Sequence, residues 1–306
     1  MAESVLITGS AGFVGRALAA RVRAEGRPCL GVGRSPREEQ GYHAIDLSAG
    51  AGPLTELLSR ERPSLIYHLA GGTAGGAQGM FSSNVSSTLH LFQAVQAVQG
   101  YQPRVLVSGS AAEYGDLGPE PISEDARERP VGEYGVAKLA ETRLALLARR
   151  RGLRVGVVRF FNIIGPGMPG SLAPARFARE SLALAAAGGG VLTVGDLSPV
   201  RDYVDLTDVV DALWTLGQRD PEEELLNICS GQPVRMGALL EEILRQVGVR
   251  VEVRTAENLL RGPGDVPVSV GDTRRLERVL GRRFTFDLSR SVARLVESLR
   301  GGSRAS

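Results

Sequence analysis

The sequence is poor in the residues that build metal sites and disulfide frameworks. Its 306 residues include two cysteines, Cys29 and Cys229, and three histidines. Two cysteines cannot form a disulfide framework or a four-cysteine zinc site. The histidines lie far from any His-x-x-x-His spacing, so we expect no metal centre.

Long apolar runs are also lacking. No stretch approaches the roughly 20 apolar residues that a membrane helix needs. Met1 leads directly into a strand-like segment, without a charged and then apolar signal region. We therefore expect a cytoplasmic protein with no membrane segment. Basic and acidic side chains nearly cancel, 36 against 34, which argues against a nucleic-acid partner.

Lysine is the scarcest charged residue. Lys138 is the single lysine, and the other 35 basic residues are arginine. A coding bias toward arginine would be one explanation of the general pattern. The position at which lysine survives is still informative, because an ammonium and a guanidinium differ in shape and chemistry.

Short aliphatic runs alternate with helix-like segments in the first half of the chain. The expected strands are Val5–Gly9, Cys29–Gly33, Leu65–Leu69, Val105–Ser108 and Val155–Phe161. Such alternation predicts parallel strands joined by right-handed crossovers, hence an α/β fold with a doubly wound sheet. Ligands of these sheets bind beyond the carboxyl ends of the strands.

The pattern loosens after about residue 162, where turns and short strand-like runs such as Leu225–Cys229 predict a smaller, interleaved C-terminal lobe. We expect a dinucleotide-binding domain over residues 1–161, with a returning segment near 200–216. The substrate-binding lobe would comprise residues 162–199 and 217–300. The glycine-containing polar tail, residues 301–306, is expected to be flexible.

A glycine-rich loop follows the first expected strand. Gly9, Gly12 and Gly15 have G-x-x-G-x-x-G spacing, with Phe13 and Val14 between the last two. In a chain with 39 glycines, about half a match to this spacing is expected by chance. The position of the loop between a strand and a helix therefore carries the argument. Glycine lets the backbone approach a pyrophosphate at a helix N-terminus. The loop predicts a Rossmann-like dinucleotide site; the alternative is a purely structural turn.

The end of the second strand bears on the choice of dinucleotide. An acidic residue there would bind the ribose hydroxyls of NAD, but the sequence has Gly33 followed by Arg34. Arginine suits a 2′-phosphate, and Arg16 could assist. We expect NADP(H) as the preferred cofactor, with NAD(H) as the alternative. Asp46 and Leu47 are expected beside the adenine.

Tyr134 precedes Lys138 by four residues, which places both side chains on one face of a helix. Tyrosine titrates near 10 and is a poor acid at neutral pH, whereas a fixed ammonium nearby favours the phenolate. The pair therefore predicts acid–base chemistry; the alternative is an exposed lysine and a packed tyrosine.

Ser108 and Ser110 follow a parallel strand. Either serine could donate a hydrogen bond to a substrate oxygen, or its hydroxyl could instead stabilise the turn.

Together these residues resemble a known family. The glycine loop, Ser110 and Tyr134-x-x-x-Lys138 are similar to the extended short-chain dehydrogenase/reductases of the NAD-dependent epimerase/dehydratase family, which act on nucleotide sugars. Further matching segments are His68–Gly71, Asn84 with Thr88, Arg159–Pro166, Arg201–Val204 and Arg261–Pro267. Those late in the chain most resemble the GDP-4-keto-6-deoxy-D-mannose reductases.

The resemblance implies roles for individual residues. Ser110, Tyr134 and Lys138 would be catalytic, with Tyr134 as the acid–base group and Lys138 on the nicotinamide ribose. Leu69, Ala70 and Gly71 would join the glycine loop in binding the cofactor. The substrate would be bound by Ser110, Asn162, Arg179, Arg201 and Arg261. A homodimer is the family expectation.

Departures from the family pattern separate its reactions. The 4,6-dehydratases carry acidic residues where this sequence has Ala111 and Ala112, and Glu113 is one place late. Alanine has no proton to give or take, which argues against a dehydratase. We expect NADPH-dependent reduction of the C4 ketone of a nucleotide-linked 4-keto-6-deoxyhexose, of the GDP-4-keto-6-deoxymannose type. The alternatives are a UDP-sugar 4-epimerase with NAD, a reductase for a dTDP- or UDP-linked sugar, and an NADP-sensing regulatory protein.

Overall fold

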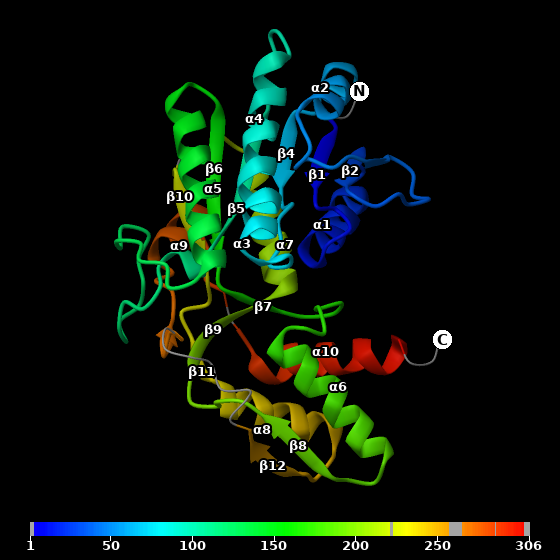
Figure 1. Cartoon of the computed structure of the whole chain (residues 1–306), viewed down its shortest axis with the longest axis vertical. Coiled ribbons are helices and arrows are strands. Elements are labelled where there is room, and N and C mark those ends of the chain that lie inside the picture. The colour runs from blue at the N-terminus through cyan, green and yellow to red at the C-terminus, as the bar shows by residue number, and fades with distance from the viewer. Residues whose placement is uncertain (1–2, 221–222, 257–264, 285, 303–306) are drawn as a thin grey trace.

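A parallel sheet forms the upper part of the molecule in Figure 1, drawn from a computed structural model that describes residues 3–220, 223–256, 265–284 and 286–302. Within these ranges the sheet has seven strands in the order β3-β2-β1-β4-β5-β6-β10, all paired in parallel. The strand bounds are β1 Val5–Thr8, β2 Cys29–Gly33, β3 Tyr42–Ala44, β4 Leu65–His68, β5 Arg104–Ser110, β6 Arg154–Phe160 and β10 Leu225–Ile228.

Helices cover both faces of this sheet. One face packs against α2 (Gly52–Glu61), α4 (Ser87–Ala97) and α5 (Glu133–Arg150). The other packs against α1 (Phe13–Ala24), α7 (Leu206–Gly217) and α9 (Arg274–Leu280). Short segments α3 (Gly76–Met80), the π-helical η1 (Phe81–Ser86) and the 3₁₀ turn η2 (Ala111–Glu113) precede α4 and α5. The predicted α/β doubly wound fold is confirmed.

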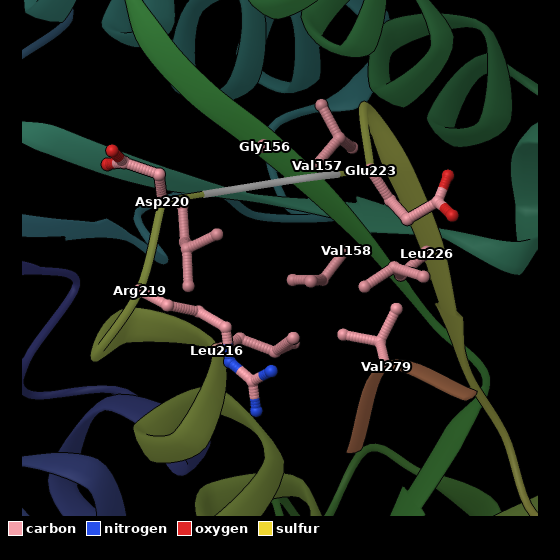
Figure 2. Close-up of a pocket in the computed structure, with 10 residues that line it drawn as sticks. Gly156, Val157, Val158, Leu216, Arg219, Asp220, Glu223, Leu226 and Val279 are labelled. Atoms are coloured by element: carbon pink, nitrogen blue, oxygen red, sulfur yellow. The ribbon is translucent and has the colours of Figure 1, made fainter. Parts of the chain in front are cut away.

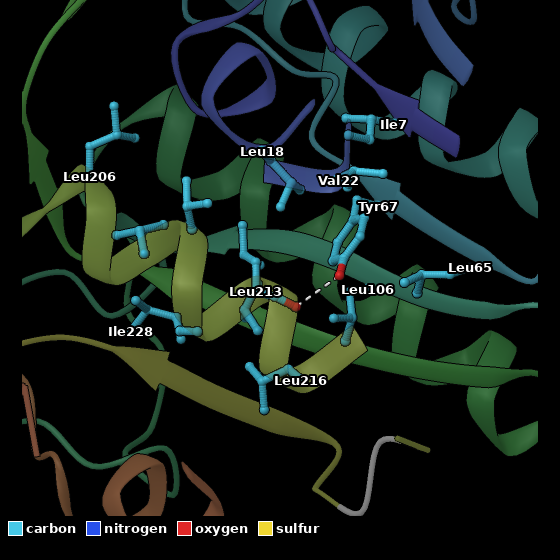
Figure 3. Close-up of a cluster of buried hydrophobic side chains, with 14 of the residues drawn as sticks. Ile7, Leu18, Val22, Leu65, Tyr67, Leu106, Leu206, Leu213, Leu216 and Ile228 are labelled. Atoms are coloured by element: carbon cyan, nitrogen blue, oxygen red, sulfur yellow. Dashed lines mark hydrogen bonds between the residues drawn. The ribbon is translucent and has the colours of Figure 1, made fainter. Parts of the chain in front are cut away.

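The core beneath α7 shows how closely the second face packs. Figure 3 shows Tyr67 of β4 reaching α7, where its hydroxyl donates a 2.9 Å hydrogen bond to the Leu213 carbonyl. A Cβ at Gly217 would lie 2.1 Å from the Tyr67 hydroxyl oxygen, so the helix end needs glycine. Leu18 and Val22 of α1 complete this cluster. These contacts fix α1, and therefore the loop that precedes it, against the sheet.

The smaller lobe lies below the sheet in Figure 1 and has its own core. Helices α6 (Ala173–Ala186), α8 (Met236–Val247) and α10 (Leu288–Gly302) pack together there. Strand β9 (Val200–Asp205) pairs with β7 (Asn162–Ile164), β11 (Pro233–Arg235) and β13 (Val268–Ser269), while β8 (Val191–Val194) pairs with β12 (Glu252–Thr255).

The predicted domain division needs four corrections. Helix α9, placed by the sequence in the second lobe, packs on the large sheet with α1 and α7. Strand β10, placed by the sequence in the second lobe, pairs with β6 and closes one edge of the large sheet. Within the segment near 200–216, α7 packs on that sheet but β9 belongs to the lobe sheet. Gly301 and Gly302, expected in a flexible tail, lie in α10; residues 303–306 fall outside the described ranges. No helix of the described ranges is long and apolar enough to cross a bilayer.

Candidate active site

The glycine loop lies where the strand order reverses, at the carboxyl ends of β1 and β4. Gly9 has a φ of +69°, and a Cβ there would lie 2.6 Å from the Leu69 carbonyl oxygen. A Cβ at Gly15 would lie 2.2 Å from the Gly9 carbonyl oxygen. Only glycine permits such contacts. The glycine loop and the segment after β4 are therefore packed together.

This loop suits a pyrophosphate. Helix α1 begins at Phe13, directly after Gly12, and has no acidic residue in its first turn. Its free N–H groups and the positive end of its dipole favour an anion there. The Ala70 N–H donates to the Thr8 hydroxyl oxygen at 3.2 Å, which ties the β4 loop to β1. The residues present fit a dinucleotide.

A side chain in place of Gly33 at the end of β2 would have to displace Tyr42. A Cβ at Gly33 would lie 2.4 Å from the hydroxyl oxygen of Tyr42, which itself donates to the Ser35 carbonyl. Arg34 is exposed. Hydrogen bonds from Ser48 lower the pKa of Asp46, and the charge of Arg34 contributes to that shift. Arg34 and Asp46 therefore lie near each other beyond β2 and β3.

The first turn of α5 brings Tyr134 close to the segment that follows β5. A Cβ at Gly135 would lie 2.4 Å from the Ala112 carbonyl oxygen, so α5 packs directly on η2. Tyr134 is partly exposed, whereas Lys138, one turn later, has 3% of its surface exposed. The alternative of an exposed lysine is thus wrong. Tyr134 and Lys138 lie four residues apart in α5 and therefore on one face of that helix.

Lys138 is held by the end of β5. Its Nζ donates to the Ser108 carbonyl and, at 3.5 Å, to the Ser108 hydroxyl. It also contacts a carboxylate oxygen of Glu141 at 2.6 Å. Burial acts to lower the pKa of the Lys138 ammonium, but the negative charge of Glu141 outweighs it, and the pKa is raised. The lysine is therefore a fixed cation.

Glu113 faces the interior and holds Ser110 in place. The Glu113 carboxylate accepts from the Ser110 N–H at 2.7 Å, while the Ser110 hydroxyl oxygen accepts from the Ala112 N–H at 3.2 Å. Glu113 also pairs with Arg159 at 2.7 Å, and both side chains are fully buried. Glu113 is consequently unable to reach a substrate, as its position one place late in the sequence predicted.

Replacing Glu113 with glutamine is expected to destabilise the fold. The glutamine amide would present N–H groups to the Arg159 guanidinium, which would lose one of its two carboxylate partners and keep Glu128 at 2.8 Å. The loss of one buried charge-assisted hydrogen bond costs about 2 kcal/mol of unfolding free energy. Denaturant unfolding measures it. The matched Glu120→Gln variant, at an exposed position, should stay within about 0.5 kcal/mol of the parent; equal stability of both variants would contradict the buried pair.

Three of the residues expected to bind substrate, Asn162, Arg179 and Arg201, lie on different elements of the second lobe. Asn162 of β7 donates to the Asp202 carbonyl of the neighbouring β9 at 3.1 Å. Arg201, also on β9, pairs with Asp265 at 3.3 Å. Arg179 of α6 is exposed and lies against Gly170. Arg261 lies outside the described residues. The structure thus places Asn162 and Arg201 on adjacent strands, and Arg179 on a helix apart from them.

The second lobe reaches the glycine loop. Phe13, the first residue of α1, packs against the core of the second lobe as well as that of the sheet. Arg16 Nη2 donates to the Gly167 carbonyl, in the turn after β7, at 3.4 Å. A ligand at the loop would therefore meet both domains.

A cavity elsewhere in the sheet domain is too small for a ligand. Figure 2 shows it between β6, β10 and the end of α7, with Leu216, Val158 and Leu226 on its wall. Its volume is about 20 Å³, room for one or two water molecules. It contains none of the predicted site residues.

Comparison with known proteins identifies the family. Residues 5–229 match the model of the NAD dependent epimerase/dehydratase family. A dTDP-6-deoxy-L-talose 4-dehydrogenase (NAD(P)(+)) of Kitasatospora kifunensis is 35% identical, covering 81% of this chain and 80% of that protein. The GDP-6-deoxy-D-mannose reductase of Pseudomonas aeruginosa is 31% identical, covering 83% of each. The chain belongs to the NAD-dependent epimerase/dehydratase family.

A solved structure agrees with this assignment. RMD from Pseudomonas aeruginosa complexed with NADPH is 28% identical, covers 98% of this chain and 99% of its own, and has a TM-score of 0.85. The family is NAD(P)-dependent, and this chain is an enzyme of nucleotide-sugar modification.

Two features of this family member escaped sequence reasoning. Asp202 is fully buried and accepts four hydrogen bonds, from the N–H and hydroxyl of Ser230 and the N–H groups of Gly231 and Gly271. It joins β9 to the loops after β10 and β13.

Glu141 contacts Lys138 inside the sheet domain. Its spacing of three residues after the lysine was a usable signal, because helical residues three apart are neighbours.

Proposed function

We propose that the protein reduces the C4 ketone of a nucleotide-linked 4-keto-6-deoxyhexose, with NADPH as reductant and GDP as the nucleotide. The observation that carries the proposal is the lack of an acid beside Ser110. Ala111 and Ala112 follow it, and Glu113 is bound to Arg159 in the interior. An elimination needs a group that takes up a proton from carbon, whereas a ketone reduction needs a single proton donor at oxygen.

Tyr134 is the proton donor in this mechanism. Its hydroxyl transfers a proton to the C4 oxygen as the carbonyl becomes an alcohol. Ser110 donates a hydrogen bond to the same oxygen, which strengthens as negative charge develops there. The Ser110 hydroxyl oxygen already accepts from the Ala112 N–H, which directs its proton away from the backbone. A bound reduced nicotinamide supplies the hydride.

Lys138 stabilises the phenolate that Tyr134 becomes. Its ammonium is fixed by the Ser108 carbonyl and by Glu141, so the charge is in place before the proton moves. It is also the residue we assign to the nicotinamide ribose. The glycine loop, with Leu69, Ala70 and Gly71, would hold the rest of the dinucleotide.

Asn162, Arg179, Arg201 and Arg261 are assigned to the nucleotide sugar. Guanidinium groups suit its phosphates, because they bind paired oxygens with two hydrogen bonds. Support for the substrate class comes from the names of the two relatives, each an oxidoreductase of a nucleotide-linked 6-deoxyhexose. The homodimer stays a prediction.

Arg34 is expected to set the cofactor preference. Replacing it with glutamine should lower kcat/KM for NADPH about tenfold or more, the loss of one charge-assisted hydrogen bond to a phosphate, and leave that for NADH unchanged. Arg37→Gln, at another exposed arginine of the same loop, should change neither value. A parent enzyme that uses NADH as well as or better than NADPH would contradict the assignment.

The nucleotide base is tested by binding. Thermal unfolding would be followed with NADP⁺ and a panel of GDP-, UDP- and dTDP-linked sugars, because a ligand that binds only the native state raises Tm. The proposal expects the largest shift with a GDP-sugar. A larger shift with dTDP- or UDP-sugars would reassign the base, and no shift with any nucleotide sugar would contradict the proposed substrate class.

A further inference from the structure

Two glycines of β2 face the same side of the large sheet. Gly31 and Gly33 are two residues apart, and successive side chains of a strand point to opposite faces. Val32, between them, points the other way and packs in the core that α2 and α4 cover. The end of β2 is where a side chain of a dinucleotide-binding sheet meets the adenosine ribose. This strand therefore presents a face without side chains at that place.

The ring of Tyr42 covers both glycines. Tyr42 of β3 pairs with Gly31 in the parallel register, so its side chain leaves the sheet on the same face. A Cβ at Gly31 would lie 3.2 Å from the ring atom Cδ2, and a Cβ at Gly33 would lie 2.4 Å from the hydroxyl oxygen. The ring therefore extends along β2 from Gly31 to Gly33, and its hydroxyl occupies the space of a side chain at position 33.

Ser10 of the glycine loop borders the same strip from the side of β1. A Cβ at Gly31 would lie 2.6 Å from the Ser10 hydroxyl oxygen. Ser10 is 8% exposed, and its hydroxyl has no hydrogen-bond partner among the described residues. Because buried hydroxyls are normally paired, this group is available to a ligand at the loop. The glycine loop and Tyr42 thus flank the end of β2 from its two neighbouring strands.

The Tyr42 hydroxyl is also bound to the turn that carries Arg34. It donates a 3.0 Å hydrogen bond to the carbonyl of Ser35, the residue after Arg34. Pro36 follows, and a proline restricts the backbone of the residue before it. Arg34 is exposed, so its own side chain contributes little to holding the turn. Tyr42 and Pro36 therefore limit the movement of the backbone that presents Arg34.

We propose that Tyr42 determines which dinucleotide the enzyme selects: it occupies the place of a ribose-binding carboxylate at position 33, and it holds the turn that presents Arg34 to a 2′-phosphate. The proposal rests on NADPH as the proposed cofactor and on the role assigned to Arg34. A carboxylate beside a 2′-phosphate would repel it, whereas the uncharged tyrosine does not. Selection therefore depends on positions 33 and 42 together, and a change at one of them does not reverse it.

A double-mutant cycle over Gly33→Asp and Tyr42→Ala tests this dependence. Binding of NADP⁺ and NAD⁺ to the parent and the three variants is measured by isothermal titration calorimetry, without any sugar. Gly33→Asp alone should not improve NAD⁺ binding, because the aspartate meets the Tyr42 hydroxyl. Tyr42→Ala alone should not improve it either, because it adds no carboxylate. The double variant should bind NAD⁺ about tenfold more tightly than the parent, the value of one charge-assisted hydrogen bond, and NADP⁺ more weakly.

The hold on Arg34 is tested with two nucleotides that differ by one phosphate, 2′,5′-ADP and 5′-AMP. Tyr42→Phe keeps the ring over β2 and removes the bond to the Ser35 carbonyl, so it also serves if Tyr42→Ala folds poorly. We expect about fivefold weaker binding of 2′,5′-ADP and unchanged binding of 5′-AMP, whereas general loss of structure would weaken both. Tyr101→Phe, which also removes a hydrogen bond to a backbone carbonyl, should change neither affinity.

Tighter NAD⁺ binding by Gly33→Asp alone, equal to that of the double variant, overturns the proposal. Unchanged binding of 2′,5′-ADP by Tyr42→Phe overturns it as well. A parent that binds 2′,5′-ADP no more tightly than 5′-AMP contradicts the proposed cofactor, and this proposal falls with it. Failure of the parent to reduce any nucleotide-linked 4-keto sugar is a separate result, because the binding experiments contain no sugar.

Discussion

Replacing Tyr134 with phenylalanine is expected to lower kcat about a thousandfold while leaving NADPH binding nearly intact. The substitution removes one oxygen, the proton donor, and general acid–base groups contribute about 10²–10⁴-fold to rate. The ring would still pack at the first turn of α5, so the glycine loop and the Lys138 slot should be undisturbed. Steady-state kinetics and a fluorescence titration with NADPH measure the two quantities separately.

A second tyrosine provides the control. The hydroxyl of Tyr101 donates to the Pro63 carbonyl at 2.7 Å, near the amino end of β5 and away from Ser110. Tyr101→Phe should lower stability and leave kcat within a factor of about two, because its hydroxyl makes a structural hydrogen bond only. Near-normal turnover in Tyr134→Phe would remove the tyrosine from the mechanism.

Lys138→Arg is expected to lower kcat about a hundredfold, although it keeps the charge. The lysine Nζ occupies a slot between the Ser108 carbonyl and the Glu141 carboxylate and has 3% of its surface exposed. A planar guanidinium with five donors is larger than this slot and would move its charge, and displacement of about 1 Å at a reacting centre can cost about 10²-fold.

Comparison with Lys138→Met separates charge from shape. If charge alone mattered, the arginine variant would be active and the methionine variant inactive. We expect both to be severely impaired, with circular dichroism showing that both remain folded. Full activity in Lys138→Arg would mean that the survival of one lysine among 35 arginines has no catalytic reason.

Local sequence signals predicted much of the fold and the centre of the site. The strands of the sheet are continuous apolar runs because helices cover both faces, and that pattern is visible without a structure. The glycine spacing was informative because close backbone contacts at Gly9 and Gly15 exclude any side chain. Tyr134 and Lys138 were paired by helical periodicity, and the structure places both beside the end of β5.

What the sequence could not show depends on contacts between distant segments. Strand β10 pairs with β6, about 70 residues earlier, and a four-residue run carries no sign of which sheet it joins. The Glu113–Arg159 pair likewise joins residues far apart in the chain. The closeness of Asn162 and Arg201 follows from pairing of β7 with β9.

The most direct test of the proposed function is cofactor stoichiometry with a nucleotide-linked 4-keto-6-deoxyhexose. The purified enzyme is supplied with NADPH carrying deuterium at C4 of the nicotinamide, and the sugar product is analysed by mass spectrometry and NMR. The account predicts one NADPH oxidised per sugar reduced, with the deuterium bound to C4 of the product. Two results together would contradict it. The first is conversion of a UDP-sugar that has a hydroxyl at C4 to its C4 epimer, with no net oxidation of cofactor. The second is that the 4-keto sugar is not reduced.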